Sequence, residues 1–231
     1  MAKIHLIGGE KGGVGKSVVA RLLAQYCIDR SIPFLGFDAD RSHGALMRFY
    51  SEYASPVLVD KYESLDAIVE SATENPERRI IVDLAAQASE PLTQWMDESQ
   101  LLEVAREIGL NIRYWHVMDT GRDSVDLLQR LFDRYGERLG YVIVLNQLRG
   151  DDFHLYRASG LAERAQTMGI ATLTLKHLSD ATMLKIDENS SSFWAAAQGD
   201  SAGGLRFGVL ERQRFKTWLK GAYDAIEALG I

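Results

Sequence analysis

The sequence lacks several features that mark other classes of protein. Among its 231 residues there is one cysteine, Cys27, so no internal disulfide can form and no cysteine pair is available for zinc. Its five histidines are scattered without the spacing of a metal site, and no apolar run approaches the length that crosses a bilayer. The net charge of −6 argues against a generally basic surface that binds DNA without specificity. These absences exclude a disulfide-stabilised domain, a cysteine-based zinc site and a membrane-spanning protein.

The start and the composition of the chain are those of an ordinary soluble domain. Residues 1–6, MAKIHL, lead directly into a predicted strand with no signal peptide before it. Together with the single cysteine, this start predicts a cytoplasmic protein. The apolar share is 46% and the charged share 25%, which are typical values. The length suits one α/β domain, residues 1–231, and no repeat or linker divides it.

Apolar, strand-like segments alternate along the chain with segments of helical periodicity. The predicted strands are residues 4–7, 34–37, 56–59, 78–83, 111–118, 140–145 and 170–175. This βαβ alternation predicts a doubly wound α/β fold, in which a mostly parallel sheet carries helices on both faces. After the last strand we expect a polar surface excursion near residues 176–204, followed by an amphipathic helix over residues 205–229.

Residues 8–17, GGEKGGVGKS, connect the first predicted strand to the first predicted helix. Strand, glycine-rich loop and helix are the context in which a G-x-x-x-x-G-K-[ST] spacing, here starting from Glu10, predicts a phosphate-binding loop. Glycines allow several backbone N–H groups to converge on one anion, and the helix adds its positive N-terminal end. Lys16 supplies a positive charge for the β- and γ-phosphates, and the Ser17 hydroxyl is a suitable ligand for Mg²⁺. The predicted nucleotide-binding residues of this segment are Gly12, Gly13, Val14, Gly15, Lys16, Ser17 and Val18.

Three carboxylates follow predicted strands at points where a parallel sheet binds ligands. Asp38 and Asp40 come directly after the strand 34–37, and Asp83 ends the strand 78–83. In open α/β sheets, ligands bind beyond the carboxyl ends of the strands. Asp83 has the Walker B position, an acid beside the phosphate loop that holds Mg²⁺ through water. For Asp38 and Asp40, ordinary strand-end or helix-capping roles are the alternative.

The run from Lys11 to Ser17, KGGVGKS, closely resembles the deviant phosphate loop of the ParA/MinD family of ATPases. The resemblance implies that Lys11 reaches across a dimer interface to the nucleotide held by the other subunit; a solvated lysine at a loop tip is the alternative. It also implies that Asp40 orients or polarises the attacking water and that Asp38 lies near the metal. Residues 41–44 read RSHG and depart from the family pattern, which leaves the hydrogen-bond partner of Asp40 open.

Asn146 follows the all-apolar strand 140–145. In the ParA/MinD family an asparagine at this point hydrogen-bonds the base, and an amide donates and accepts in one plane, which suits adenine. The Thr-Lys-x-Asp string that reads guanine is absent, so the sequence favours ATP over GTP. The segment after Asp83 also departs from the family, which commonly carries proline and glycine there. Its Gln87 either orients a water, as glutamines do in some phosphoryl-transfer sites, or is an ordinary loop residue.

The resemblance spans essentially the whole chain, and the start and the altered switch segments look more like the StbB/TraL plasmid-stability and conjugation branch than like chromosome partitioning proteins. It implies an ATPase that works as an ATP- and Mg²⁺-dependent molecular switch. ATP binding would favour a homodimer, and hydrolysis would separate its subunits. Such a switch acts on a protein partner or on DNA, in plasmid segregation or positioning, although the net charge does not indicate DNA. A basic amphipathic helix over residues 205–229 is compatible with a membrane anchor, but Asp224 and Glu227 favour a helix docked on the core.

The sequence leaves two alternative functions open. A metabolic ligase of the dethiobiotin-synthetase or cobyrinate-amidase type shares the fold and phosphorylates a carboxylate. Its phosphate loop typically lacks the early lysine, so Lys11 counts against it. The altered switch segments are also compatible with a nucleotide-binding structural adaptor whose hydrolysis is negligible.

Overall fold

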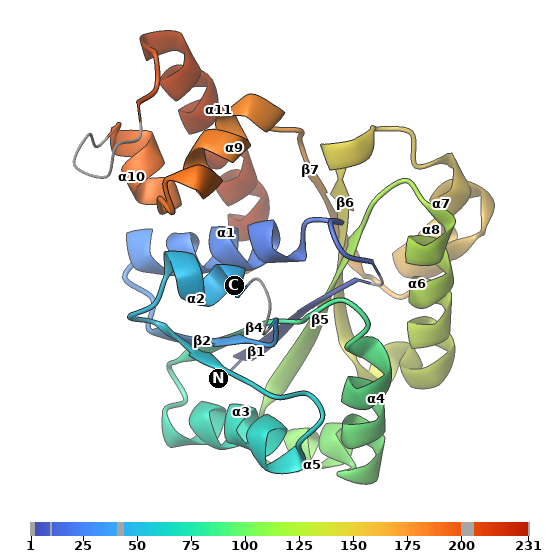
Figure 1. Cartoon of the computed structure of the whole chain (residues 1–231). Coiled ribbons are helices and arrows are strands. Elements are labelled where there is room, and N and C mark those ends of the chain that lie inside the picture. Colours follow the sequence, from blue (N-terminus) through green and yellow to red (C-terminus); the bar gives the residue numbers. More distant parts are fainter. Residues whose placement is uncertain (1–2, 10, 41–43, 200–205, 231) are drawn as a thin grey trace.

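A parallel sheet forms the centre of the computed structural model, which describes residues 3–9, 11–40, 44–199 and 206–230. Within these residues the sheet has seven strands in the order β3-β2-β4-β1-β5-β6-β7, and every neighbouring pair runs parallel (Figure 1). The strands are β1 Lys3–Gly8, β2 Phe34–Asp38, β3 Ala54–Pro56, β4 Arg79–Asp83, β5 Asn111–Met118, β6 Gly140–Asn146 and β7 Ala171–Leu175. The predicted doubly wound fold is therefore confirmed. The sequence predicts the third strand over residues 56–59, but β3 ends at Pro56. It is an edge strand of the sheet, where a proline, which has no backbone N–H, is tolerated.

Helices cover both faces of the sheet (Figure 1). They are α1 Lys16–Asp29, α2 Ala45–Phe49, α3 Tyr62–Glu74, α4 Ser89–Glu98, α5 Leu101–Glu107, α6 Arg122–Tyr135, α7 His154–Ala158, α8 Leu161–Thr167, α9 Asp180–Glu188, α10 Phe193–Gln198 and α11 Val209–Glu227, with short 3-10 turns at Gly136–Arg138 and Gln147–Arg149. One apolar cluster lies beneath α1, α2 and α9 to α11, and a second lies beneath α3 to α8. Among the described residues, no helix combines the length and the apolar composition that a membrane span requires.

The central strands are apolar on both faces because helices cover both faces. In β4, Ile80 and Val82 are buried in the cluster beneath α3 to α8, whereas Ile81, between them, is buried in the cluster beneath α1. Successive side chains of a strand point to opposite faces. The unbroken apolar runs of the sequence are therefore what a sheet covered on both sides requires.

The carboxyl ends of the central strands meet at one edge of the sheet. Asp38, at the end of β2, pairs in register with Asp83, at the end of β4, and Ile7 of β1 pairs with Asp83 from the other side. The chain builds β2 to β4 on one side of β1 and β5 to β7 on the other, so the strand order reverses beside β1. Ligands of open α/β sheets bind at such a point. The topology thus brings the predicted acidic residues to the loop that follows β1.

The segment expected to form a polar surface excursion, residues 176–204, contains the helices α9 and α10. Ile186 of α9 and Phe193 of α10 are fully buried in the cluster that also contains the apolar face of α1. This part of the chain therefore belongs to the core instead of leaving it. These helices are nine and six residues long, which is too short for a helical period to be recognised in the sequence.

The C-terminal helix, predicted over residues 205–229, is α11, which begins at Val209; residues 200–205 lie outside the described part of the chain. Phe215, Leu219 and Ala222 on one side of α11 are buried in the cluster beneath α1. The helix is therefore docked on the core along this face.

Arg21 ties the C-terminal helices to α1. Its side chain is 3% exposed, and its Nη1 donates to Asp187 of α9 at 2.8 Å. The guanidinium lies over the rings of Phe49 and Phe193, at 3.6 and 4.5 Å from their centroids. Burial lowers the pKa of Arg21, and the charge of Asp187 opposes that effect. A buried charge is costly unless it is paired, so α9 and α10 stabilise the packing of α1.

Candidate functional site

The segment between β1 and α1 forms a tight glycine loop. Gly13 and Gly15 have φ values of 77° and 98°, which residues with side chains rarely adopt. A Cβ at Gly15 would also lie 2.1 Å from Asn146 Nδ2, so the loop passes directly against the end of β6. The helix α1 begins at the next residue, and its unpaired N–H groups and positive end therefore adjoin the loop. Glu10, the first position of the predicted spacing, lies outside the described residues.

Lys16 lies inside this loop instead of extending into solvent. The residue is 7% exposed, and its Nζ donates to the carbonyl oxygen of Lys11 at 2.8 Å. The positive charge is therefore held next to the backbone of the loop. Ser17 and Val18 follow on the first turn of α1 and line the same cavity as Lys16.

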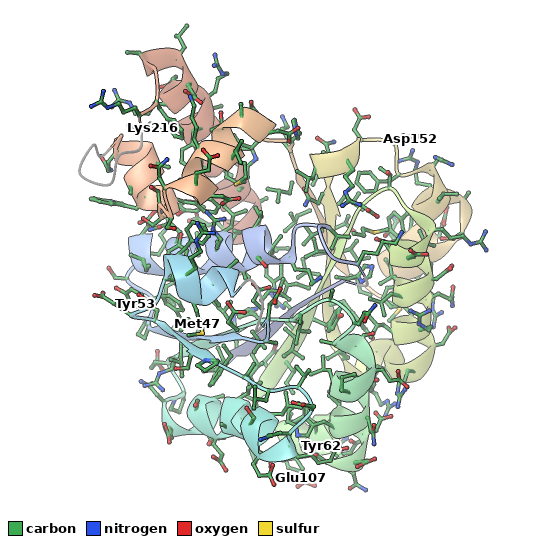
Figure 2. The ribbon with its side chains drawn as sticks, viewed as in Figure 1. Met47, Tyr53, Tyr62, Glu107, Asp152 and Lys216 are labelled. Carbon is green, nitrogen blue, oxygen red and sulfur yellow. The ribbon has the colours of Figure 1, made fainter. Side chains whose placement is uncertain are left out.

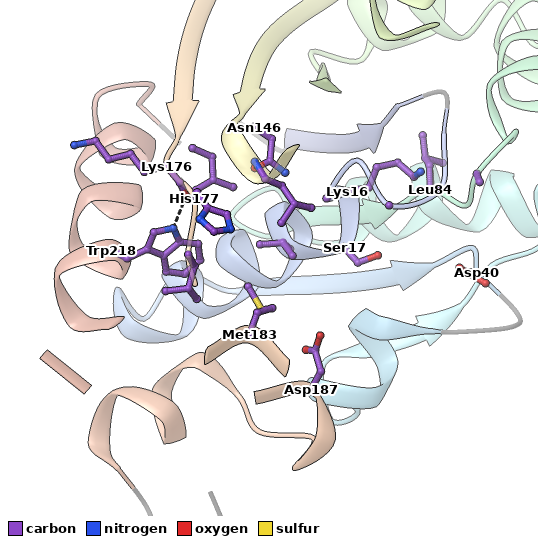
Figure 3. A pocket seen from close by; sticks show the side chains of 18 residues that line it. Lys16, Ser17, Asp40, Leu84, Asn146, Lys176, His177, Met183, Asp187 and Trp218 are labelled. Carbon is purple, nitrogen blue, oxygen red and sulfur yellow. Dashed lines mark hydrogen bonds between the residues drawn. The ribbon is translucent and has the colours of Figure 1, made fainter. Parts of the chain in front are cut away.

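A cavity of about 310 Å³ opens beside the loop (Figure 3), a volume within the range of small-molecule sites. At one end its walls are the glycine loop, the first turn of α1, Asp40 and Leu84. At the other end, segments after β6 and β7 and the helices α9 and α11 contribute the apolar and aromatic side chains of Leu148, Leu178, Met183 and Trp218. The polar residues Lys176, His177 and Asp187 of these segments also line the cavity. A ligand with an anionic end and an apolar ring system would match both ends.

Sequence reasoning did not find the apolar end of this cavity. Trp218 of α11 donates from its Nε1 to the carbonyl oxygen of Lys176 at 2.7 Å, the dashed line in Figure 3. This bond fixes the indole against the segment that follows β7. His177, in the same segment, lies 3.1 Å from Asp180. In the sequence Trp218 belongs to the apolar face of a helix, and nothing in that pattern indicates that the helix returns to β7.

Asp83 ends β4 as a carboxylate that is 1% exposed. Neither of its oxygens makes a hydrogen bond of normal geometry. Burial raises the pKa of Asp83 to about 7, and the nearby carboxylates of Asp38 and Asp40 raise it further. The Ser17 hydroxyl and the Lys16 ammonium act in the opposite direction and favour the ionised form.

Buried oxygens without partners are uncommon and call for a compensating group. A divalent cation beside Ser17 and Asp83 would compensate this carboxylate, and Mg²⁺ prefers oxygen ligands that include water and substrate phosphates. The residues present therefore fit Mg²⁺. Within residues 3–9, 11–40, 44–199 and 206–230 no three His, Cys, Asp or Glu side chains are grouped as a metal site. Asp83 and Ser17 would offer such a cation one carboxylate and one hydroxyl.

Asp38 and Asp40 have different surroundings at the end of β2. Asp38 Oδ1 accepts from the backbone N–H of Asp40, and Asp38 Oδ2 accepts from that of Met47, both at 3.0 Å. Asp38 therefore caps the first turn of α2, as the alternative reading of the sequence expected, and burial raises its pKa. Asp40 lines the cavity. Residues 41–43, whose departure from the family pattern left the partner of Asp40 open, lie outside the described residues. Metal contact by Asp38 and water positioning by Asp40 stay predictions.

Lys11 pairs within its own chain. Its Nζ forms an ion pair with Asp123 Oδ2 in the first turn of α6, and about half of each side chain is exposed. The hydrogen bond to Asp123 raises the pKa of Lys11. A second cation, Arg149, lies beside Gly13 and 3.6 Å from Asp119. Lys11 is accessible at the surface, and any contact with a second subunit requires that it first leave Asp123.

Asn146 has a structural task at the end of β6. Its Nδ2 donates to the carbonyl oxygen of Val14 at 2.7 Å, and its Oδ1 accepts from the N–H of Leu148 at 3.3 Å. The amide thus holds the glycine loop against the sheet. An amide offers two donors and two acceptor positions, and Asn146 lines the cavity, so its contact with a base stays a prediction. Gln87 is exposed, has a φ of 62° and is not among the residues that line the cavity.

Solved structures share this architecture. A ParA family ATPase of Chlorobium tepidum superposes with a TM-score of 0.53 and 15% identity, covering 95% of this chain and 99% of that one. MinD of Aquifex aeolicus gives a TM-score of 0.52 at 10% identity, covering 94% and 97%. The chain has the P-loop NTPase fold of ParA and MinD. A Borrelia burgdorferi protein assigned to plasmid partition, solved with AMPPNP, has the same ParA/MinD fold, with a TM-score of 0.55, 13% identity and coverages of 96% and 98%.

Curated sequences give a second set of relatives. Protein MobD of Acidithiobacillus ferrooxidans is 28% identical over 187 residues, which cover 78% of this chain and 80% of MobD. Protein TraL of Escherichia coli is 26% identical over 162 residues, which cover 67% of each chain. No protein-family model matches the chain. The resemblance to ParA/MinD proteins and to TraL is therefore confirmed.

Proposed function

We propose that this protein binds and hydrolyses Mg·ATP and works as a molecular switch, forming a homodimer with ATP and acting on a protein partner. The observation that carries the proposal is the arrangement at the carboxyl edge of the sheet. There, Lys16 is buried in a glycine loop, beside Asp83, a buried carboxylate without a hydrogen bond of normal geometry. Lys16 lines a cavity that also contains Ser17, Asp40 and, at its apolar end, Trp218. The curated relatives and the nucleotide-bound P-loop fold neighbour support this assignment.

The phosphates are assigned to the polar end of the cavity. The N–H groups of the loop and the start of α1 hold the β- and γ-phosphates, and Lys16 neutralises charge that develops during transfer. Ser17 would bind Mg²⁺ and Asp83 would hold it through water; bound Mg²⁺ would supply positive charge at the phosphates. Asp40, on the same cavity wall, orients the attacking water. Phosphoryl transfer depends mainly on such positioning and charge.

The base is assigned to the apolar end. Trp218, Met183 and Leu178 form a wall there, and the hydrogen bond to Lys176 fixes the indole of Trp218 before the base arrives. Asn146 reaches the base with the donor and the acceptor position that its bonds to the protein leave unused. We therefore assign the base as adenine.

Lys11 is assigned to the nucleotide of the second subunit. It lies at the surface, held by Asp123, and a triphosphate carries more negative charge than one carboxylate. ATP in a facing subunit would therefore attract Lys11 away from Asp123. A MinD protein of Aquifex aeolicus was solved as a complex with MinC, and the names TraL and MobD belong to the curated relatives. On these grounds we propose a cytoplasmic role in plasmid maintenance or conjugation, with a protein partner.

The proposal is tested by the mass in solution with Mg²⁺ and either ADP or a non-hydrolysable ATP analogue. Sedimentation velocity should show a monomer with ADP and a dimer with the analogue. The variant Lys11→Ala should bind the analogue but stay monomeric. Lys220→Ala is the matched control, because Lys220 is also an exposed lysine paired with an acid, Asp224 at 2.7 Å, and should dimerise normally.

Three results would contradict the proposal. A wild-type profile identical with ADP and with the analogue would refute the switch. A dimer formed by Lys11→Ala would refute the bridging role of that lysine. ATP turnover that requires an added carboxylic acid would indicate a ligase instead.

A further inference from the structure

A second cavity, of about 540 Å³, lies at the far end of α1 from the glycine loop. Asp29 of its wall is twelve residues beyond Ser17 on the same helix, or about 18 Å at ~1.5 Å per residue. Its lining includes none of the residues that line the nucleotide cavity. The loop after α2, the C-terminal end of α1 and the start of α10 contribute its walls. It is therefore a separate site.

Two exposed aromatic residues stand in these walls. Trp194, in the first turn of α10, is 50% exposed, and Tyr53, after α2, is 39% exposed. Figure 2 shows Tyr53 at the outer edge of the molecule, beneath α2. Tyr53 stacks against Phe34 with a ring separation of 5.1 Å and an angle of 12°, which fixes the plane of its ring. Such rings bind cations over their faces.

The charge of the cavity has one sign. Its lining contains the carboxylates of Asp29 and Glu52 and no lysine, arginine or histidine. Asp29 accepts hydrogen bonds only from neutral donors, Gln25 Nε2 at 2.9 Å and the Tyr223 hydroxyl at 2.8 Å. Glu52 has no ion-pair partner among the described residues. Neither carboxylate therefore forms an ion pair within the described part of the chain, although the charge of Arg30 acts on Tyr223, one of the donors to Asp29.

One buried side chain holds these walls in place. Gln25, 1% exposed, accepts at its Oε1 from the Tyr50 hydroxyl and from the N–H of Trp194, both at 3.0 Å. Its Nε2 donates to Asp29. The same amide therefore positions the aromatic wall and one of the two carboxylates before any ligand arrives, which lowers the entropic cost of binding.

We propose that this cavity binds an arginine side chain of a partner protein. A planar guanidinium stacks on indole and phenol rings and forms paired hydrogen bonds with a carboxylate, which a lysine ammonium cannot do in the same geometry. The exposed position of Trp194, Tyr53 and Glu52 admits a side chain that projects from another polypeptide. The proposed occupant is one arginine side chain, whose guanidinium matches the carboxylates of Asp29 and Glu52 in the lining.

The experiment is an NMR titration with three peptides, acetyl-Gly-Arg-Gly-amide and its lysine and citrulline counterparts. The arginine peptide should shift the indole N–H of Trp194, with a dissociation constant of about 1 mM, as expected for one anchored side chain. Citrulline has the same shape without the charge and should bind at least about tenfold more weakly. Lysine should bind several-fold more weakly than arginine.

Variants separate this site from general attraction to an acidic protein. Glu52→Gln, and Trp194→Ala followed through the backbone resonances of residues 49–53, should each weaken the arginine peptide at least about fivefold. Both positions are exposed, so the fold should persist, and thermal unfolding checks this. Glu163→Gln removes the same charge from exposed α8 and should leave binding unchanged. Lys16→Ala should also bind the peptide normally, so this test does not depend on the nucleotide site.

Several outcomes would overturn the assignment. Equal binding of arginine and citrulline, or equal losses in Glu52→Gln and Glu163→Gln, would show that the cavity does not recognise the charge. Equal binding of lysine would remove the case for a guanidinium. If the indole N–H resonance of Trp194 does not shift at saturating arginine peptide, the peptide binds elsewhere on the protein.

Discussion

Replacing Asp83 by asparagine should stabilise the protein without ligands and abolish its stabilisation by Mg·ATP. The two side chains have nearly the same shape, but asparagine is neutral at every pH. Asp83 is fully buried without a hydrogen bond of normal geometry, and burial raises its pKa from 3.8 to about 7. The native state of the wild type therefore carries the cost of an ionised buried carboxylate, and the variant does not.

The magnitude follows from the difference between the folded and unfolded pKa values. The pKa of Asp83 rises from 3.8 to about 7, a difference of roughly three units. At ~1.4 kcal/mol per unit, the ionised carboxylate lowers the free energy of unfolding by ~4 kcal/mol at pH 8. The raised pKa means that Asp83 stays protonated to a higher pH in the folded state than in the unfolded state. The cost is therefore absent well below pH 4, grows as the pH rises towards 7 and is complete above that value. Between pH 5 and pH 8 the advantage of Asp83→Asn should grow by about 2 to 3 kcal/mol.

Urea unfolding of both proteins at pH 5 and pH 8, without nucleotide or metal, measures this difference. Titrating groups that do not act on the pKa of Asp83, including the buried His5 and His116, are common to both proteins and cancel in the comparison. Asp38, Asp40 and Lys16 are coupled to Asp83, so their contribution is part of the measured difference. Adding Mg·ATP at pH 8 should then stabilise the wild type and leave the variant unchanged, since binding to the native state alone raises stability. A stability difference that is the same at both pH values would refute the buried-charge argument. Equal stabilisation by Mg·ATP would refute the metal role of Asp83.

Three further changes test the nucleotide site. Lys16→Ala should weaken ATP binding about a hundredfold in isothermal titration, because a charged hydrogen bond to phosphate is lost; retained affinity would contradict the phosphate-loop assignment. Trp218→Ala should weaken the binding of ATP about tenfold but leave the binding of tripolyphosphate unaffected. Trp218→Phe is the control that keeps a ring against the base. An equal loss of affinity for both ligands would indicate a general packing defect. Asp123→Asn should lower the analogue concentration needed for dimerisation by about two- to fivefold, because Lys11 no longer has to leave an exposed ion pair. Asp126→Asn is its control on the same helix, and a shift of equal size there would attribute the effect to net charge alone.

The order of the elements could be predicted because each signal is local. Apolar runs such as residues 140–145 must be buried on both faces, and a glycine loop between strand and helix is recognisable from its spacing alone. The positions of Asp38 and Asp83 at strand ends follow from the same pattern. Parallel pairing then places these ends at one edge, which explains why the polar half of the site was accessible to sequence reasoning.

The apolar half of the site depends on contacts between distant segments. Trp218 lies against the segment after β7 through one hydrogen bond to a backbone carbonyl, and no local pattern encodes a backbone partner 42 residues away. The ion pair between Lys11 and Asp123 joins the glycine loop to the first turn of α6, from a different part of the chain, so the sequence did not predict the position of Lys11. Ile186 and Phe193 show the same limit, because α9 and α10 are too short for a helical period to be recognised in the sequence.

The buried Arg21 has a consequence for the newly made chain. Its counterion, Asp187, comes 166 residues later, and the ring of Phe193 that lies over it comes later still. While the ribosome is still producing the middle of the protein, the first helix therefore holds a cation that has the ring of Phe49 but lacks its carboxylate and the ring of Phe193. A ribosome-bound chain halted before Asp187 should leave this helix open to protease and should fail to retain nucleotide. The earliest-made part of the pocket thus matures only when translation is nearly complete.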